Sequence, residues 1–552
     1  MRTGRGRRTI AIVVAVVVVV VLAATGAGYL LLRTAGSPRQ TAASYLQAWQ
    51  QGDYAAMGKV SVNVPPGGLA GPLTRAAAQL GVRHTHLTLG NVTSSGGSTQ
   101  ARFTVTDSLA SGHTWTYQGR LPLVQRSRHW WVNWSPAAIY PALRAGERFV
   151  LHAVWPARAP VLAADGTVLS SPQAVAQSGS ISLLTGNVVR ATAGQAKSLG
   201  APYKAGDLIG QGGIEQAYQA RLAGKPAQTI QIVGPGKRVD VTAARFAGVP
   251  GAAVHTSIAM RYQRAASHAV ASARTSKPID MVALQPSTGK VLAVVERPGG
   301  FNRALQGEFP PGSAFKVVTA SALAKAGLRP SSTVQCPPHV TLGGRTFHND
   351  ANEQLGTTNM ERAFAISCNT TFAMLATQHL TGSSLRSMAQ AYGFNSSPAL
   401  GIPATLGKFT TPHATVDLAA DAFGQGTDLV NPLSQASVAG AVDSGTWQPP
   451  QLVTSPAPHQ AARPHKLSSA IVDTLRPLMR AVVTSGTAAG VGLPPGVYGK
   501  TGTAEYGSGA NPPAHAWFIG YRGDLAFAVL VEGGGLGADA SAPIANAFLR
   551  GL

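Results

Sequence analysis

The chain has 552 residues, a formal net charge of +23 at pH 7 and 45% hydrophobic residues, which together predict several folded domains and exclude wholesale disorder. Its two cysteines, Cys336 and Cys368, are too few for a disulfide-rich scaffold or a structural zinc cluster, and its 14 histidines show no spacing typical of metal ligands. We therefore expect no metal and no cofactor. For the cysteines we favour buried thiols, with a bridge between them as the less favoured alternative.

The N-terminus predicts a membrane anchor. Residues 10–32 form a run of 23 residues without a charge, roughly 34 Å long as a helix, and four arginines precede it. The positive-inside tendency places residues 1–9 in the cytoplasm and the rest outside it, as a single-pass protein of the plasma membrane. A cleaved signal peptide is the alternative, because small residues occur at 23–28. Removing the four arginines leaves +19 of the +23, which favours a membrane surface or anionic wall polymers over nucleic acid as partners.

Residues 38–148 predict a small α+β domain. Helices are expected over 40–51, which carries an apolar stripe, and over 72–80. Alternating β-rich runs follow at 84–92, 99–107, 114–124 and 129–134. This order predicts helices laid on an antiparallel sheet, and we expect the three tryptophans of the last run to pack in the core rather than stack on a ligand.

The pattern changes over residues 149–275, where a strand, an Asp-Gly turn and a second strand are expected at 157–169 and a helix at 258–273. This stretch contains no catalytic constellation, so we expect a scaffold or pedestal domain. Residues 276–552 begin with a predicted hairpin, continue through a mostly helical middle and end in three strand-like runs and a helix. Strands at both ends predict one sheet flanked by helices, so the fold class is multidomain α+β.

The stretch around Ser313 carries the first chemical motif. Pro310, Pro311 and Gly312 end any preceding element, and helix formers follow Ser313, so this serine is expected at a helix N-terminus. Lys316 lies three residues on, which places its amine on the same helical face, within reach of the serine hydroxyl. A desolvated lysine amine with a lowered pKa can take the proton of a serine nucleophile.

The pattern Ser-x-x-Lys is not specific by itself, since it recurs at Ser287–Lys290. That copy lies between two apolar runs, so Thr288-Gly289 predicts a hairpin turn and no site. A serine and an asparagine at the spacing S-x-N also occur at Ser61 and Asn63, before any candidate nucleophile. We therefore assign no chemistry to either copy.

Two further motifs follow Ser313 in the chain. They are Ser367-Cys368-Asn369, after a helix-like run, and Lys500-Thr501-Gly502-Thr503, after a strand-like pair. The first lies 54 residues beyond Ser313 and the second lies 133 residues beyond Ser367, so only a folded domain can bring them together. The order S-x-x-K, S-x-N, K-T-G is the set found in penicillin-binding proteins and class A β-lactamases.

With these motifs, residues 276–552 resemble the penicillin-binding, or transpeptidase, domain of a class B penicillin-binding protein, the serine D,D-transpeptidase that cross-links peptidoglycan. Further similar stretches are Asn302-Arg303-Ala304, Phe423-Gly424-Gln425-Gly426, Asn431-Pro432-Leu433, Ser485-Gly486-Thr487-Ala488 and 515–520. Residues 149–275 resemble the dimerisation or pedestal domain of that family less sharply, because Arg158-Ala159 stands where an arginine-glycine pair is usual. Residues 38–148 resemble the nuclear transport factor two-like domain of the low-affinity, methicillin-resistance type.

The resemblance implies a catalytic role for five residues. Ser313 would attack the carbonyl between the two terminal D-alanines of a stem peptide, and Lys316 would be the general base. Ser367 would relay a proton toward the leaving amine, while Asn369 would orient Lys316. Lys500 would bind the terminal carboxylate.

The resemblance also implies substrate contacts from the rest of the third motif. Thr501 and Thr503 would help to bind the carboxylate, and Gly502 would leave room for the substrate to lie as an added strand. Backbone N–H groups of Ser313 and Thr503 would form the oxyanion hole. The implied partners are peptidoglycan stem peptides, β-lactam antibiotics, the plasma membrane and a glycan-polymerising membrane partner.

Two alternatives share these motifs. A serine β-lactamase is normally a free, secreted domain, whereas this chain places an anchor and two modules before the motifs. A β-lactam sensor needs a cytoplasmic signalling domain, and only about nine residues precede the predicted anchor. A glycosyltransferase activity is not expected, because residues 38–148 lack a paired-carboxylate signature.

Overall fold

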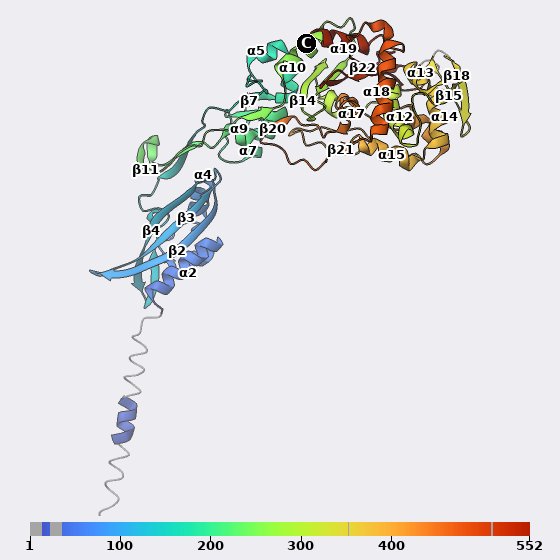
Figure 1. Ribbon diagram of the computed structural model, residues 1–552. Coiled ribbons are helices and arrows are strands. Elements are labelled where there is room, and N and C mark those ends of the chain that lie inside the picture. The colour runs from blue at the N-terminus through green and yellow to red at the C-terminus, as the bar shows by residue number, and fades with distance from the viewer. Residues whose placement is uncertain (1–13, 22–35, 351–352, 509–511) are drawn as a thin grey trace, which may run out of the picture. The chain divides into compact units, whose positions relative to one another are not determined.

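The computed structural model describes residues 14–21, 36–350, 353–508 and 512–552, and these fall into two compact units (Figure 1). The first unit runs to Ala157 and includes Ala191–Asp207 and Gly224–Pro250, and the second contains the remaining segments. The predicted anchor over residues 10–32 falls mostly outside the described residues. Residues 14–21 are helical and exposed, and none of the helices in the described ranges is long and apolar enough to span a bilayer.

The first unit contains the predicted helices laid on an antiparallel sheet. The helices are α2 (Pro38–Gln51), α3 (Tyr54–Lys59) and α4 (Ala70–Leu80). The strands are β1 (Ser61–Val62), β2 (Val82–Ser95), β3 (Ser98–Leu109), β4 (Thr114–Arg126) and β5 (His129–Asn133), in the spatial order β1-β5-β4-β3-β2. Strands β2 to β5 pair antiparallel, and the short β1 pairs parallel with β5. A second sheet joins β6 (Arg148–Val154), β10 (Ala227–Val233) and β11 (Val239–Phe246).

Local sequence explains the first helix of this unit. Ser37 accepts a hydrogen bond from the backbone N–H of Gln40, Pro38 occupies the first turn, and Gly52 ends the helix in the left-handed region at φ 72°. Two of the three tryptophans of β5 and its continuation pack in the core, as expected, namely Trp130 and Trp134. The prediction was wrong for the third, because Trp131 is half-buried outside that core and donates to the carbonyl of Arg126.

The second unit is built on one five-stranded antiparallel sheet. Its strands are β13 (Ile279–Leu284), β14 (Val291–Arg297), β22 (Tyr498–Glu505), β23 (Ala514–Tyr521) and β24 (Ala526–Val531), in the order β14-β13-β24-β23-β22. The two ends of the domain therefore form one sheet, as predicted. Helices α10 (Met260–Ala271) and α19 (Ser541–Arg550) contact one another and the sheet, and α17 (Pro432–Ser444) packs on β13, β23 and β24 (Figure 1).

Most of the longer helices of this unit lie between the two ends of the sheet in sequence, whereas α5 (Pro172–Gln177), α6 (Ile181–Thr185), α8 (Gly213–Ala217) and α9 (Gln219–Ala223) precede it. The helices between the two ends include α12 (Lys316–Lys325), α13 (Met360–Ala365), α14 (Asn369–His379), α15 (Gly382–Ala391), α16 (Thr415–Asp421) and α18 (Ser469–Thr484). The expectation of a mostly helical middle missed four short strands, β15 (Thr333–Cys336), β16 (His339–Leu342), β17 (Arg345–His348) and β18 (Gly356–Asn359). These strands form two small two-stranded sheets that pack on α13 and α14.

Within the segment 149–275, a strand, an Asp-Gly turn and a second strand were expected at 157–169. The structure has only a short strand there, β7 (Val161–Leu162), with one bridge from Leu162 to Val168 across the Asp165-Gly166 turn. Strand β7 pairs with β12 (Val254–Thr256), which pairs in turn with β20 (Val453–Ser455). Residues far apart in sequence thus share one small sheet beside the main one.

Candidate active site

Ser313 lies in a 3₁₀ turn, η3 (Gly312–Phe315), that leads directly into α12. Gly312 has φ 52°, and its N–H donates to the carbonyl of Gly424 at 3.0 Å. A Cβ at Gly312 would lie 2.2 Å from the carbonyl oxygen of Thr503 on β22, so only glycine fits between these two segments. This close backbone contact fixes Ser313 against the sheet edge, where it is 5% exposed.

The side chain of Lys316 is fully buried, and its amine contacts three of the predicted site residues. The Nζ lies 2.9 Å from Ser313 Oγ, 3.2 Å from Ser367 Oγ and 2.5 Å from Asn369 Oδ1, and it also donates to the carbonyl of Ser367 at 2.6 Å. Burial lowers the pKa of Lys316 well below its ordinary value, and the positive charge of Lys500 lowers it further. Both effects favour the neutral amine, which is the form that can take a proton from the serine hydroxyl.

Ser367 and Asn369 lie at the junction of α13 and α14. Ser367 is one of few non-glycine residues in the left-handed region, at φ 69°, which turns its side chain and its carbonyl toward Lys316. Asn369 is the first residue of α14, and its Nδ2 donates to His348 O at 3.3 Å and to Asp350 Oδ1 at 3.4 Å. These two acceptors orient the amide so that its oxygen faces Lys316.

Cys336 and Cys368 are joined by a disulfide, with Cα atoms 6.2 Å apart. The favoured expectation of two buried thiols was therefore wrong. The missed strand β15 carries Cys336 to the start of α14, a proximity that no local pattern in the sequence reveals. The bond ties the middle residue of the S-x-N motif to the two-stranded sheet β15–β18.

Lys500 reaches the same cluster from the edge strand β22. Its Nζ donates to Ser367 Oγ at 2.8 Å and to its neighbour's carbonyl, Thr501 O, at 3.0 Å. Burial lowers the pKa of Lys500 to about 7, an effect that the negative charge of Asp350 opposes. The Ser367 hydroxyl thus stands between two lysine amines.

The other residues of the third motif line β22 beside the nucleophile turn. Thr501 Oγ1 shares a hydrogen bond with Thr487 Oγ1 at 2.6 Å. A Cβ at Gly502 would lie 3.0 Å from the carbonyl of Pro311 and 3.1 Å from the N of Ala314, so the strand and the turn meet backbone to backbone. Thr503 is half-buried, and Gln425 donates weakly to its carbonyl at 3.5 Å.

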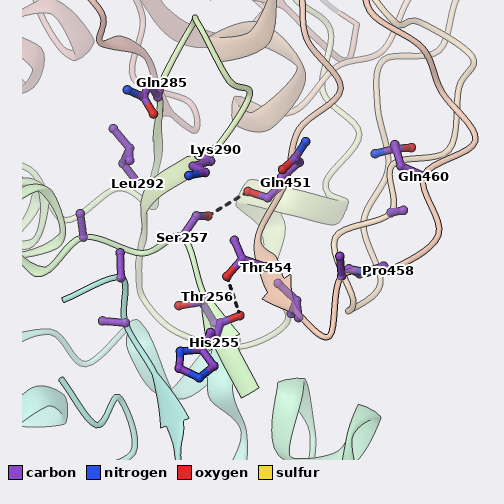
Figure 2. Close-up of a pocket in the computed structure, with 16 residues that line it drawn as sticks. His255, Thr256, Ser257, Gln285, Lys290, Leu292, Gln451, Thr454, Pro458 and Gln460 are labelled. Atoms are coloured by element: carbon purple, nitrogen blue, oxygen red, sulfur yellow. Dashed lines mark hydrogen bonds between the residues drawn. The ribbon is translucent and has the colours of Figure 1, made fainter. Parts of the chain in front are cut away.

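The second Ser-x-x-Lys copy forms no such cluster. Strands β13 and β14 pair as the predicted hairpin, and Ser287 in its turn donates to Asp524 Oδ2 at 2.7 Å. Lys290 instead lines a separate cavity of about 710 Å³, with His255, Gln285 and Gln451 among its walls (Figure 2). None of the predicted catalytic residues lines that cavity. Ser61 and Asn63 belong to the other unit.

The sequence motifs did not identify two residues that lie close to the predicted site. Asp350 lies near both lysines, raising the pKa of each, yet no motif includes it. Thr487 belongs to the Ser485-Gly486-Thr487 stretch, but its contact with Thr501 is not visible without the fold. Over the described ranges, no group of three or more His, Cys, Asp or Glu side chains has a geometry that could hold a metal ion.

A buried serine–lysine pair at a sheet edge, completed by S-x-N and K-T-G, defines the class of active-site serine acyl-transfer enzymes. Comparison with known proteins supports this class of enzyme. The family "Penicillin binding protein transpeptidase domain" matches residues 280–550, "NTF2-like N-terminal transpeptidase domain" matches 37–147, and "Penicillin-binding Protein dimerisation domain" matches 174–256. The chain belongs to the class B penicillin-binding proteins with a nuclear transport factor two-like N-terminal domain.

The chain is similar to individual members of this family. The chain is 32% identical to the peptidoglycan D,D-transpeptidase PbpA of Mycolicibacterium smegmatis over 329 residues, which cover 49% of this chain and 66% of that protein. It is 31% identical to PbpA of Mycobacterium tuberculosis over 332 residues, again 49% of this chain and 66% of the relative. The crystal structure of Pseudomonas aeruginosa PBP2 in complex with WCK 5153 has 25% identity and a TM-score of 0.60, covering 73% of this chain and 96% of that one.

Proposed function

We propose that this protein is a peptidoglycan D,D-transpeptidase that acts through a serine acyl-enzyme and is acylated by β-lactams. The observation that carries the proposal is the buried Lys316 amine, 2.9 Å from Ser313 Oγ and linked through Ser367 Oγ to Lys500. Burial favours the neutral form of that amine, which is the form that can accept a proton.

Acylation begins when the Ser313 oxygen attacks the carbonyl carbon between the two terminal D-alanines of a stem peptide. The hydroxyl proton moves to Lys316 Nζ as the new C–O bond forms. The backbone N–H groups of Ser313 and Thr503 donate hydrogen bonds to the carbonyl oxygen and stabilise the negative charge that develops on it. Gly312 supports this arrangement, because its contact with Thr503 O holds the two segments together.

The C–N bond then breaks, and the leaving amine must gain a proton. Ser367 Oγ lies 3.2 Å from Lys316 Nζ, so its hydroxyl can pass a proton from the lysine ammonium to that amine. Free D-alanine leaves, and Ser313 keeps the acyl group as an ester. Lys500, Thr501 and Thr503 bind the terminal carboxylate of the substrate, with the Lys500 charge as the main attraction.

The amine of a second stem peptide then attacks the ester carbonyl and loses a proton to Lys316, which forms the cross-link and restores Ser313. Edge strand β22 offers the backbone groups along which a stem peptide can pair as an added strand. β-Lactams acylate Ser313 as mimics of the D-Ala-D-Ala end. In this proposal water hydrolyses the acyl-enzyme only slowly, whereas in a serine β-lactamase water hydrolyses it rapidly.

The proposal includes the location that the sequence predicts. The uncharged run 10–32 and the arginines before it support a single-pass anchor in the plasma membrane, with the catalytic domain outside the cytoplasm. Stem peptides are substrates on that side, and cross-linking needs glycan strands that a polymerising membrane partner supplies. The residue roles and the three domain ranges, 38–148, 149–275 and 276–552, belong to the same proposal.

Labelling of intact cells with a fluorescent penicillin tests the assignment. We expect Ser313→Ala to abolish covalent labelling, and the matched variant Ser287→Ala to keep it, because Ser287 only bonds Asp524 in a turn. The labelled protein should fractionate with membranes. Rapid multiple turnover of the penicillin without a lasting adduct would establish a β-lactamase instead, and a drug-dependent transcriptional response without any cross-linked product would establish a sensor.

A further inference from the structure

The outer face of the sheet in the first unit is polar and basic. The face is defined here as the outward side chains of β2, β3 and β4 and is called the cationic face. Its members are His84, His86, Thr88, Arg102, Thr104, Thr106, Thr116, Gln118 and Arg120. The residues that alternate with them on β3 and β4, such as Phe103 and Leu121, are buried under the helices, so the outward side chains face solvent.

Arg102 and Arg120 stand directly opposite each other on this face. Register pairs Arg102 of β3 with Arg120 of β4, and both side chains are exposed. Opposed residues of an antiparallel pair have Cβ atoms roughly 5 Å apart, and like charges in that position are unfavourable. An anion between the two guanidinium groups turns this repulsion into attraction.

A third arginine approaches the same level of the sheet. Strand β2 has a bulge between Leu89 and Val92, and a Cβ at Gly90 in that bulge would lie 3.1 Å from the carbonyl of Arg102. Arg39 of α2 donates from Nη1 to the carbonyl of Gly90 at 3.3 Å. Arg39 thus reaches the edge of the sheet at β2 from α2, on the side that the helices cover, while Arg102 and Arg120 point outward.

No carboxylate offsets these charges. Residues 36–157, all of which the structure describes, contain ten arginines and lysines and three acidic residues. Asp107 is buried on the inner face with Thr85, Asp53 accepts from the first turn of α3, and Glu147 accepts from the N–H of Arg144. The acids are thus engaged elsewhere, and the partner of the cationic face must supply the negative charge.

The polar groups of the face identify the kind of partner. Thr104 accepts from Gln118 Nε2 at 2.9 Å, and Thr106 and Thr116 lie 3.4 Å apart, so hydroxyl and amide groups continue from the arginines along the strands. The nine members of the face are all polar or charged, and the outward row of β4 reaches the apolar Pro122 and Val124 only beyond the arginine pair, whereas a face that docks on a bilayer inserts apolar side chains at the headgroup level. Repeated phosphates joined by hydroxylated units match this pattern better than a lipid surface does.

We propose that the cationic face binds a flexible polymer with recurring phosphodiester groups, held by Arg102 and Arg120. Bidentate guanidinium contacts to phosphate supply the attraction, and the threonine and glutamine row accepts and donates hydrogen bonds to the units between phosphates. Such binding would hold the enzyme beside an anionic polymer and does not depend on the chemistry at Ser313.

The test measures binding of fluorescein-labelled poly(glycerol phosphate) to the full-length protein in neutral detergent by fluorescence anisotropy. Arg102→Gln with Arg120→Gln should weaken binding at low salt by about tenfold or more and reduce the dependence of log K on log salt by about one to two. The matched control, Arg75→Gln with Arg144→Gln, removes the same charge from exposed arginines outside the face and should stay within about twofold of the wild type.

Every other outcome overturns the proposal. Equal losses in the two double variants would mean that net charge alone attracts the polymer, and no loss in either would mean that the face takes no part. Displacement of the polymer by soluble short-chain phosphatidylglycerol, at lower phosphate concentration than by inorganic phosphate, would identify a lipid headgroup as the occupant. Penicillin labelling at Ser313 should be equal in all variants, which reports that the unit containing Ser313 is intact, and the Arg75→Gln with Arg144→Gln variant controls for the same loss of charge within the first unit.

Discussion

Removing the charge of Lys500 should change the pH at which Ser313 is acylated. Lys316 Nζ and Lys500 Nζ lie 3.2 Å and 2.8 Å from the same Ser367 Oγ, so the two nitrogens are at most 6.0 Å apart. Two unit charges at that distance repel by about 3 kcal/mol at an effective dielectric constant near 20. This repulsion acts against the ammonium form of Lys316 and lowers its pKa.

In Lys500→Met the repulsion is lost, so the pKa of Lys316 rises and a smaller share of the amine is neutral at any given pH. The acid limb of the acylation profile should therefore move to higher pH. An interaction of about 3 kcal/mol corresponds to about two pH units. Because the pKa of Lys500 is itself about 7, its charge is complete only below neutrality, and we expect a movement of about one to two pH units.

The assay is the second-order rate constant for acylation of the full-length protein by a fluorescent penicillin, measured across a pH series. Weaker carboxylate binding in Lys500→Met lowers the whole profile, but the position of its acid limb reports Lys316. Lys325→Met is the matched control, because Lys325 is an exposed lysine at the end of the same helix, α12. An acid limb that stays in place or moves to lower pH in Lys500→Met would refute the electrostatic coupling of the two amines.

Two further changes test the surroundings of the site. Thr487→Val removes the hydroxyl 2.6 Å from Thr501 Oγ1, and we expect an acylation rate constant three- to tenfold lower, which corresponds to about 0.5–1.5 kcal/mol. Thr487→Ser keeps the hydroxyl and should stay near the wild type. Thr484→Val makes the same change at an exposed threonine and is the control. Equal losses in the valine and serine variants would show that packing, not the hydroxyl, matters. Replacing Cys336 and Cys368 together by alanine opens a loop of 32 residues, which should cost about 3–4 kcal/mol of unfolding free energy in the chain-entropy account. Thermal unfolding with and without reductant checks this, since reductant should destabilise the wild type alone; a wild type indifferent to reductant would contradict it.

The local part of this site could be predicted from the sequence. Pro310, Pro311 and Gly312 predict the turn before Ser313, and a spacing of three residues on a helix places Lys316 beside it, because both facts depend on neighbouring residues only. The hairpin turn at Ser287 was predictable for the same reason. Such arguments succeed where chain geometry fixes the distance between side chains.

The parts that could not be predicted depend on contacts between distant segments. Asp350 and Thr487 reach the cluster from other segments of the domain, and nothing in their local sequence marks their neighbours. The four short strands β15–β18 were missed because each has only four residues, too few for a clear alternation of side chains. Because β15 was not predicted, the sequence did not show that Cys336 lies beside Cys368. The preference for free thiols followed from this.

Backbone contact, rather than side-chain packing, fixes the nucleophile in this fold. A Cβ on Gly312 would meet Thr503 O, one on Gly424 would lie 2.1 Å from Gly312 O, and one on Gly502 would lie 3.0 Å from Pro311 O. Three segments therefore meet at Ser313 through glycines and have no intervening rotamers to rearrange. Because the proposed oxyanion donors belong to two of these segments, their separation follows the backbone of the sheet edge. The enzyme can thus bury two lysines beside one serine, at a cost in desolvation, without losing the alignment that acyl transfer requires.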